Sequence, residues 1–336
     1  MGLYPRRSTY HIGHIPLVPK ALRAKPPSYP FSLRIACFQK GCYLSLMAPY
    51  AAITFVYKSY PFLRKWVEYY GGLFGRKNLF IISHGDDPVH RVICEGCNII
   101  QVPRDFNVEF DIVRWRFLSL QVSSLLEYFD WVLCIDCDEL IIADPRYGMS
   151  VCDVLQSSQS SVLAPIGYHL LGNESAGEIR IDWARPLLEQ FNVLIFDASY
   201  CKPVIVSKPV TFYPGGHGVS DTSFVHHPAL ILVHLKYLDY NRIVHLAREY
   251  SQDLIDQNAK VRGKMSYIWK SGMEGEKSRI AEYQKRPVLS DENACVFCAN
   301  AAKKTKLSFE DGEIMQPTHA RHKVAIAVPE RLRSLV

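Results

Sequence analysis

Two aspartates follow an apolar segment near the middle of the chain. Asp136 and Asp138 come after residues 131–135, which read Trp-Val-Leu-Cys-Ile. A strand through this segment would place both carboxylates on one face, because side chains two residues apart in a strand share a side. Adjacent carboxylates repel each other and raise their own pKa unless a cation lies between them. Such oxygen ligands suit Mg²⁺ or Mn²⁺, which commonly bridge to phosphates, so the pair predicts a metal–diphosphate site.

Alternating strand and helix patterns surround this acidic pair. β-branched and aromatic residues predict strands at 52–57, 78–82 and 98–102. Pro61 starts a helical pattern that closes at Gly71 and Gly72, and an apolar stripe predicts a second helix over 115–129. Strands separated by helices predict a Rossmann-like α/β fold, with a mostly parallel central sheet flanked by helices. Ligands of such sheets bind outside the carboxyl ends of the strands, where the acidic pair falls.

The second half of the chain has a different pattern. Short runs broken by proline, glycine and asparagine predict strands at 162–165, 193–196, 203–206, 210–213 and 230–233. Asn241 is expected to cap a helix that reaches 259, and another amphipathic helix covers 264–285. We divide the chain into an extension (1–50), a main domain (51–260) and a helical segment with a tail (261–336). The basic end of this tail cannot be placed from its pattern.

Charge and composition limit the classes to which the protein can belong. The net charge of +6 suits anionic ligands or an anionic membrane surface, but it is not the dense basic stripe of a nucleic-acid-binding protein. No Asp or Glu precedes Glu68, and residues 1–50 are basic and rich in proline. We expect this extension to be disordered, and it could contact a membrane peripherally. A targeting segment is the alternative.

The ten cysteines include three Cys-x-x-Cys pairs. Cys94, Cys97, Cys295 and Cys298 could together form a structural zinc site, and reduced thiols are the alternative. Unpatterned cysteines favour a reducing compartment. We therefore expect the protein in the cytoplasm or against the inner face of a membrane.

Three segments carry a family resemblance. Residues 53–70 read ITFVYKSYPFLRKWVEYY, residues 131–139 read WVLCIDCDE, and residues 233–243 read VHLKYLDYNRI. They resemble the opening strand and helix, the strand ending in Asp-x-Asp-Glu and the late histidine segment of GT-A-fold glycosyltransferases of the family 2-like group. The resemblance spans about 51 to 250. It implies sugar transfer from a nucleotide-diphosphate sugar, bound by 51–145, to a glycan, lipid or small-molecule acceptor, bound by 146–240.

The resemblance implies roles for the metal ligands. Asp136 and Asp138 would coordinate Mg²⁺ or Mn²⁺, which assists departure of the diphosphate. A histidine late in the chain would complete the site. His234 fits by its segment, and His217 is the rival because its flanking glycines permit close approach of the backbone to a ligand. A hydrogen-bonded histidine without metal is the alternative for both.

Further residues would contact the nucleotide sugar. Asp86 or Asp87 would bind the uridine or the ribose, and Arg114 or Arg116 could meet the diphosphate. Lys202 matches a lysine in the second half of the family and could contact phosphate. A solvated surface side chain is the alternative at each of these positions.

The catalytic base is the least defined role. Asp221 lies in the same glycine-rich loop as His217, while Asp182 and Glu139 compete with it. The Glu-Asp pair common in the acceptor region of the family is absent. Two alternative functions therefore remain: a nucleotidyltransferase that uses the same acidic metal site, and an inactive GT-A-like interaction module. The segment 57–61 lacks the glycine-rich phosphate loop that a nucleotidyltransferase normally needs.

Overall fold

The computed structural model describes residues 49–104, 110–172, 181–220, 222–239, 267–289, 309–310, 313–314 and 323–336. Residues Ala48–Val336 form one compact unit. The predicted extension before residue 49 and the predicted helix at 241–259 lie outside the described residues. No helix within the described ranges is long and apolar enough to cross a membrane.

The first half of the chain forms the parallel part of the sheet, as predicted. Its strands are β1 (Tyr50–Val56), β2 (Leu79–His84), β3 (Asn98–Val102) and β4 (Trp131–Cys134). Its helices are α1 (Tyr60–Phe74), α2 (Pro88–Ile93) and α3 (Phe110–Leu125). The strands pair in the order β3-β2-β1-β4, and every pair is parallel. Their carboxyl ends therefore lie along one edge of the sheet.

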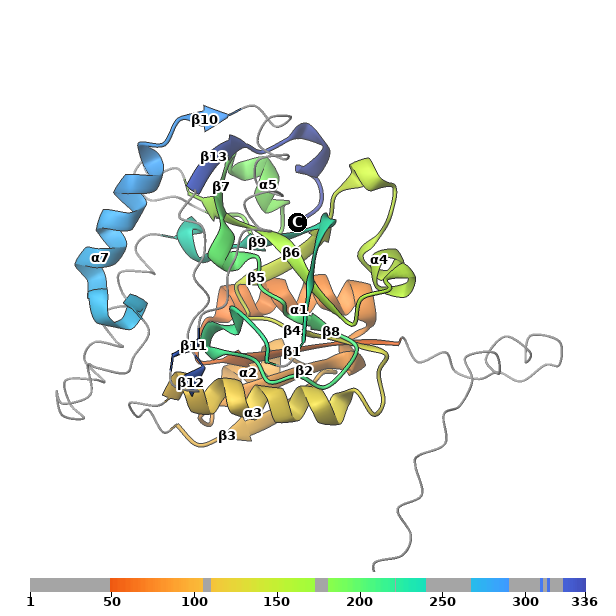
Figure 1. Cartoon of the computed structure of the whole chain (residues 1–336). Helices are drawn as coiled ribbons and strands as arrows, with labels where there is room; N and C mark the ends of the chain where they lie inside the picture. The colour runs from red at the N-terminus through yellow and green to blue at the C-terminus, as the bar shows by residue number, and fades with distance from the viewer. Residues whose placement is uncertain are drawn as a thin grey trace, which may run out of the picture. The chain divides into compact units, whose positions relative to one another are not determined.

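The central strand β1 is buried on both faces. Ala52 and Val56 belong to a core that contains α1, whereas Ala51 and Ile53 belong to a second core that contains α3. The two helices accordingly lie on opposite sides of the parallel strands (Figure 1). Burial on both faces explains why the residues of this strand do not alternate between apolar and polar.

The predicted end of one helix and one predicted strand are wrong. α1 continues through both predicted stop glycines to Phe74, which is buried, and the helix ends instead at Gly75 with φ of 83°. The strand predicted at 210–213 is not formed. Phe212 makes only an isolated bridge with Val219, because the chain turns through η6 (Pro214–Gly216), where both glycines have positive φ.

The second half of the chain extends the sheet in mixed orientation. Its strands are β5 (Glu139–Ala143), β6 (Val162–Leu171), β7 (Val193–Asp197), β8 (Ile205–Val206) and β9 (Val225–His234), and its helices include α4 (Val151–Ser157) and α5 (Leu187–Gln190). β8 pairs antiparallel with both β4 and β6 and so joins the two halves. β9 pairs parallel with β6 and antiparallel with β5. The α/β class is confirmed, with a mixed central sheet flanked by helices.

The end of the chain, which sequence pattern left unplaced, returns to this sheet. β13 (Lys323–Ala327) pairs antiparallel with β7, and β10 (Val288–Leu289) pairs with β13. A separate hairpin joins β11 (Phe309–Glu310) to β12 (Glu313–Ile314). α7 (Tyr267–Gln284) packs Ile280 and Tyr283 against Leu171, Ile195 and Ala325 of the sheet. This helix therefore covers the second half of the sheet beside β7 and β13 (blue, Figure 1).

Candidate functional site

The predicted aspartate pair lies in a turn and not on a strand, which corrects the sequence argument. β4 ends at Cys134, and β5 already starts at Glu139. The Glu139 N–H closes the turn by donating to the Asp136 carbonyl at 3.1 Å. Strand alternation therefore does not orient the two carboxylates. The turn holds Asp136 and Asp138 at the carboxyl end of β4 with 24% and 23% of their side chains exposed.

Asp136 lies between two cations that come from different elements. Its Oδ1 accepts from Arg114 Nη1 of α3 at 3.1 Å, and its Oδ2 lies 3.5 Å from Lys202 Nζ. Burial raises the pKa of Asp136, but Arg114 and Lys202 outweigh this effect and the net shift is downward. Asp136 is therefore a carboxylate at neutral pH.

Lys202 and Glu139 form a buried ion pair beneath the turn. The Nζ–Oε1 distance is 2.5 Å, and the two residues are 3% and 0% exposed. Burial lowers the pKa of Lys202, but Glu139 and Asp136 outweigh burial and raise it. Lys202 is thus not a solvated surface lysine, and its positive charge lies among the carboxylates of the turn.

Sheet register aligns His234 with residues from two neighbouring strands. Antiparallel pairing with β5 places Glu139 opposite His234, and parallel pairing with β6 places His169 opposite it on the other side. His234 Nε2 lies 3.3 Å from Asp138 Oδ2. Burial raises the pKa of Asp138, but the charge and hydrogen bond of His234 outweigh burial and lower it.

A chain of hydrogen bonds continues from His234 away from the turn. His234 Nδ1 lies 2.8 Å from His169 Nδ1, and His169 Nε2 lies 3.3 Å from Asp197 Oδ2. Because a carboxylate only accepts, we assign the donor at His169 to Nε2, and a neutral His169 then accepts the Nδ1–H of His234. The Nε2 lone pair of a neutral His234 would face Asp138. Nε2 of His234 and Oδ2 of Asp138 would then both be acceptors, 3.3 Å apart. Such a contact requires a cation between the two atoms, either a proton or a metal ion.

The donor atoms around the turn fit a divalent ion that has few protein ligands. Asp138 offers oxygen and His234 offers nitrogen, and His169 fixes the ring of His234 as the outer partners of metal-binding histidines do. Within the described ranges, no three His, Cys, Asp or Glu side chains are grouped to hold a metal ion. Mg²⁺ commonly keeps several waters and uses one or two carboxylates with phosphate oxygens. An ion here would need oxygen ligands from water or a substrate.

A cluster of aromatic and cationic side chains lies at the carboxyl ends of the parallel strands. Tyr57 follows β1, His84 ends β2 and Arg104 follows β3. The Arg104 guanidinium lies 3.8 Å from the centre of the Tyr57 ring, and its Nη1 lies 3.1 Å from His84 Nδ1. Phe55 connects this cluster to the acidic turn, as we call the turn that carries Asp136 and Asp138. The centre of the Phe55 ring is 5.2 Å from the centre of the His84 ring and 6.0 Å from the Arg114 guanidinium carbon.

The acidic loop after β2 has partners within the protein. Asp87 caps α2, because Oδ1 accepts from a backbone N–H of that helix at 2.9 Å, and Oδ2 accepts from the Tyr60 hydroxyl at 3.0 Å. Asp86 is exposed and pairs with Arg91. Arg116, the alternative to Arg114, is exposed on α3. The nucleotide contacts of Asp86 and Asp87 stay predictions.

The candidates for the catalytic base are spread over the structure. Asp221 lies outside the described residues. Glu139 is buried and paired with Lys202. Asp182 is exposed and accepts from the Ala184 N–H at 3.0 Å within a local turn. The identity of the base stays a prediction.

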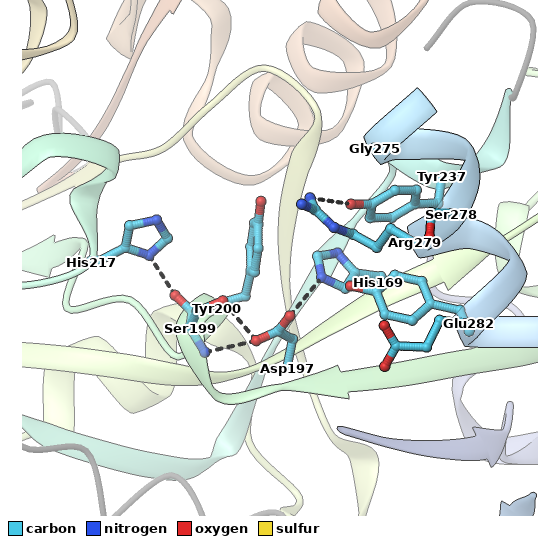
Figure 2. A pocket seen from close by; sticks show the side chains of 11 residues that line it. His169, Asp197, Ser199, Tyr200, His217, Tyr237, Gly275, Ser278, Arg279 and Glu282 are labelled. Atoms are coloured by element: carbon cyan, nitrogen blue, oxygen red, sulfur yellow. Dashed lines mark hydrogen bonds and ion pairs between the residues drawn. The ribbon is translucent and has the colours of Figure 1, made fainter. Parts of the chain in front are cut away.

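A pocket of about 470 Å³ opens beside the histidine pair formed by His169 and His234. Figure 2 shows the wall of this pocket, which includes His169. His169 and Asp197 of the sheet line it together with Tyr200 of η5 (Ala198–Tyr200) and residues of α7. His217, the rival metal ligand, is also in the wall, and its Nδ1 donates to the Ser199 carbonyl at 2.6 Å. His234 contacts Asp138, so the two histidines considered for the metal face different surroundings.

Sequence reasoning missed His169, Asp197 and Tyr200 as site residues. His169 lies within a fully buried apolar strand, and Asp197 ends another buried strand. A polar residue inside or at the end of a buried run is the only local signal, because burying such a group is unfavourable unless it has a partner. Their partners come from other strands, which local pattern does not identify.

The cysteines give no support for a metal centre of their own. Burial raises the pKa of Cys94 to about 12, which favours the thiol over the thiolate that zinc binds. Cys295 and Cys298 lie outside the described residues. The six cysteines within the described ranges form no disulfide.

Comparisons with known proteins add little to this geometry. No family model matches the chain, and no curated protein matches it. Among solved structures, the chain is similar to a mannose-1-phosphate geranyltransferase from Thermus thermophilus, with a TM-score of 0.25 and 10% sequence identity. The match covers 66% of each chain, just under two thirds of that enzyme. A likeness this weak carries no argument about activity.

Proposed function

We propose that the chain is a GT-A-type glycosyltransferase that moves a sugar from a nucleoside diphosphate sugar to an acceptor hydroxyl. The observation that carries the proposal is the 3.3 Å contact between Asp138 and His234 at the carboxyl end of β4. The hydrogen bond that His234 donates to His169 fixes the ring of His234 so that Nε2 faces the carboxylate. This combination suits Mg²⁺ or Mn²⁺ that is also bound to phosphate oxygens.

Asp138 and His234 would hold the ion, and the sequence also predicts Asp136 as a ligand. When bound there, the ion would neutralise negative charge on the diphosphate as it leaves. His217 remains a weaker candidate as a ligand.

Arg114 and Lys202 bring two further positive charges to the acidic turn, where both contact Asp136. A guanidinium can donate to two phosphate oxygens at once, and an ammonium acts as a compact charge. Arg114 would therefore orient the diphosphate, as the sequence predicts, and Lys202, which is buried against Glu139, would add its charge from beneath the turn.

Tyr57 and Arg104 would bind the nucleoside. They present a ring and a guanidinium at the carboxyl ends of β1 and β3, and flat groups of this kind stack on nucleobases. Phe55 makes this cluster continuous with Arg114, so a nucleoside here would direct its diphosphate towards the acidic turn. Asp86 and Asp87 flank the same edge, and one of them would contact the uridine or the ribose, as the sequence predicts.

A thermal-shift screen of nucleoside diphosphate sugars, with and without Mn²⁺, tests the proposal. We expect stabilisation only when both are present, by about 2.7 kcal/mol at one hundred times the dissociation constant. The variants Asp138→Asn and His234→Ala should weaken Mn²⁺ binding at least tenfold in calorimetry, since each removes a direct ligand.

Asp130→Asn is the matched control, because it makes the same change at an exposed aspartate. Its Mn²⁺ affinity should equal that of the unmodified protein. Stabilisation by nucleoside triphosphates alone would indicate the nucleotidyltransferase instead. A folded protein that binds neither class of nucleotide would indicate an interaction module.

A further inference from the structure

We infer that the pocket beside the histidine pair binds the acceptor, and that this acceptor is a carbohydrate and not a lipid. This rests on the proposed function and narrows its substrate class. The sequence leaves glycan, lipid and small-molecule acceptors open, whereas the wall of this pocket distinguishes between them.

The described part of the pocket wall is polar and aromatic. Apart from one glycine, every lining residue in the described part of the chain carries a hydroxyl, imidazole, carboxylate or guanidinium group, and none of these residues is aliphatic. The groups that carry the argument are Asp197, Tyr200, Tyr237, Arg279, Glu282 and Tyr283. A prenyl or acyl chain would desolvate these groups without giving them hydrogen bonds, which is costly. A sugar offers hydroxyls to the polar groups and C–H faces to the rings.

The arrangement of the wall also suits a small saccharide. Tyr200 stands between His217 on one side and Arg279 of α7 on the other (Figure 2). Arg279 Nη1 donates to the Tyr237 hydroxyl at 3.3 Å and lies 3.4 Å from Glu276 Oε1, so its guanidinium is held at the edge of the pocket. The volume of about 470 Å³ is in the usual range of small-molecule sites, roughly 300–1,000 Å³.

A row of contacting side chains connects the pocket to the acidic turn. His169 lines the pocket and contacts His234, and His234 contacts Asp138. The ring of Tyr200, which also lines the pocket, stacks on His234 with centroids 4.4 Å apart. A hydroxyl of a bound saccharide would therefore lie one layer of side chains from the turn where the donor diphosphate is proposed to bind.

Saturation-transfer NMR on the full chain tests the inference. The probes are methyl glycosides of hexoses and N-acetylhexosamines, with farnesol as the lipid probe, each with and without Mn²⁺ and nucleoside diphosphates. We expect signals from at least one glycoside and none from farnesol. Ser278→Trp places a large ring at an exposed position of the pocket wall and should weaken glycoside binding at least tenfold.

Ser124→Trp is the matched control, because it makes the same change at an exposed serine of α3 outside the pocket wall. It should bind glycosides normally. Signals from farnesol alone, silence from every glycoside in both conditions, or unchanged glycoside binding by Ser278→Trp would each overturn the inference.

The same samples distinguish a failure of this inference from a failure of the proposed function. Ser278→Trp should retain stabilisation by nucleotide sugar with Mn²⁺, because it leaves the acidic turn intact. Glycoside binding without any nucleotide-sugar binding would overturn the transferase and leave a carbohydrate site. Nucleotide-sugar binding without glycoside binding would overturn only the inference.

Discussion

Lys202 is the residue on which the charge balance of the acidic turn depends. Its ammonium lies 2.5 Å from Glu139 Oε1 and also contacts Asp136. Burial raises the pKa of Glu139 and the net shift is upward, although Lys202 opposes it by favouring the carboxylate. A buried charge of this kind is tolerated only while its partner is present.

Replacing Lys202 with Met should lower the free energy of unfolding by about 3–5 kcal/mol, because Glu139 is left buried without its cation. Urea denaturation at neutral pH measures this loss. Adding Glu139→Gln to the same chain should recover a large part of it. Lys208→Met, at an exposed lysine, should change stability by less than about 0.5 kcal/mol. Equal losses for the two lysine variants would contradict the assigned ion pair.

At the scale of elements, local patterns predicted the parallel strands well and the site incompletely. β1 to β4 are apolar runs separated by helical periodicity, so pattern located them and their shared edge. The sequence pattern does not predict β5, because no glycine or proline separates Glu139 from the preceding strand. The turn that carries Asp136 and Asp138 therefore has the pattern of a continuing strand. The contact between His169 and His234 depends on the register of β6 with β9, whose partners are 65 residues apart. Such long-range pairing leaves no local signal.

The close approach of β6 to η5 gives a prediction at this scale. A Cβ added at Gly167 would overlap the carbonyl carbon and oxygen of Tyr200. Gly167→Ala should therefore push η5 away from β6 and destabilise the fold by about 1–3 kcal/mol. It should also weaken glycoside binding, since Tyr200 lines the pocket.

Thermal unfolding and saturation-transfer NMR measure both effects. Gly72→Ala provides the comparison, because its Cβ would meet nothing within 4 Å and it lies inside α1. This control should keep or raise stability by up to about 1 kcal/mol. The account of β6 and η5 fails if the two alanine variants unfold at the same temperature.

At the scale of the whole molecule, the last described segment is tied to the middle of the chain by charge. Asp144 follows β5 and its side chain is fully buried. Arg331 of η9 (Glu330–Leu332) contacts both carboxylate oxygens at 2.8 and 3.0 Å, and Arg146 adds a contact at 2.6 Å. Burial raises the pKa of Asp144, but the hydrogen bonds from Arg331 and Arg146 outweigh it and lower the pKa to about 2.

The contacts between Asp144 and Arg331 predict that the stability of the fold depends on pH. The folded pKa lies below the unfolded value of 3.8, so Asp144 stabilises the fold fully above about pH 4 and loses this effect as pH falls towards 2. The shift corresponds to about 2 kcal/mol. Arg331→Met should destabilise the protein at pH 7, and its difference from the unmodified chain should shrink near pH 2.

Urea unfolding at several pH values measures this difference. Arg333→Met is the control, because Arg333 pairs with Glu330, whose side chain is 90% exposed, and such pairs contribute about 0–1 kcal/mol. A constant difference between Arg331→Met and the unmodified chain over the whole pH range would refute the role of Asp144.

The short strand β10 has a consequence for how copies of this protein meet. It follows Pro287, and among the described residues it pairs with Ala325 and Ile326 in the middle of β13. A two-residue strand preceded by a residue without an N–H offers few backbone groups to an incoming chain. As far as the described residues go, this side of the sheet is therefore a poor template for edge-to-edge aggregation, even though Val288 and Leu289 are exposed.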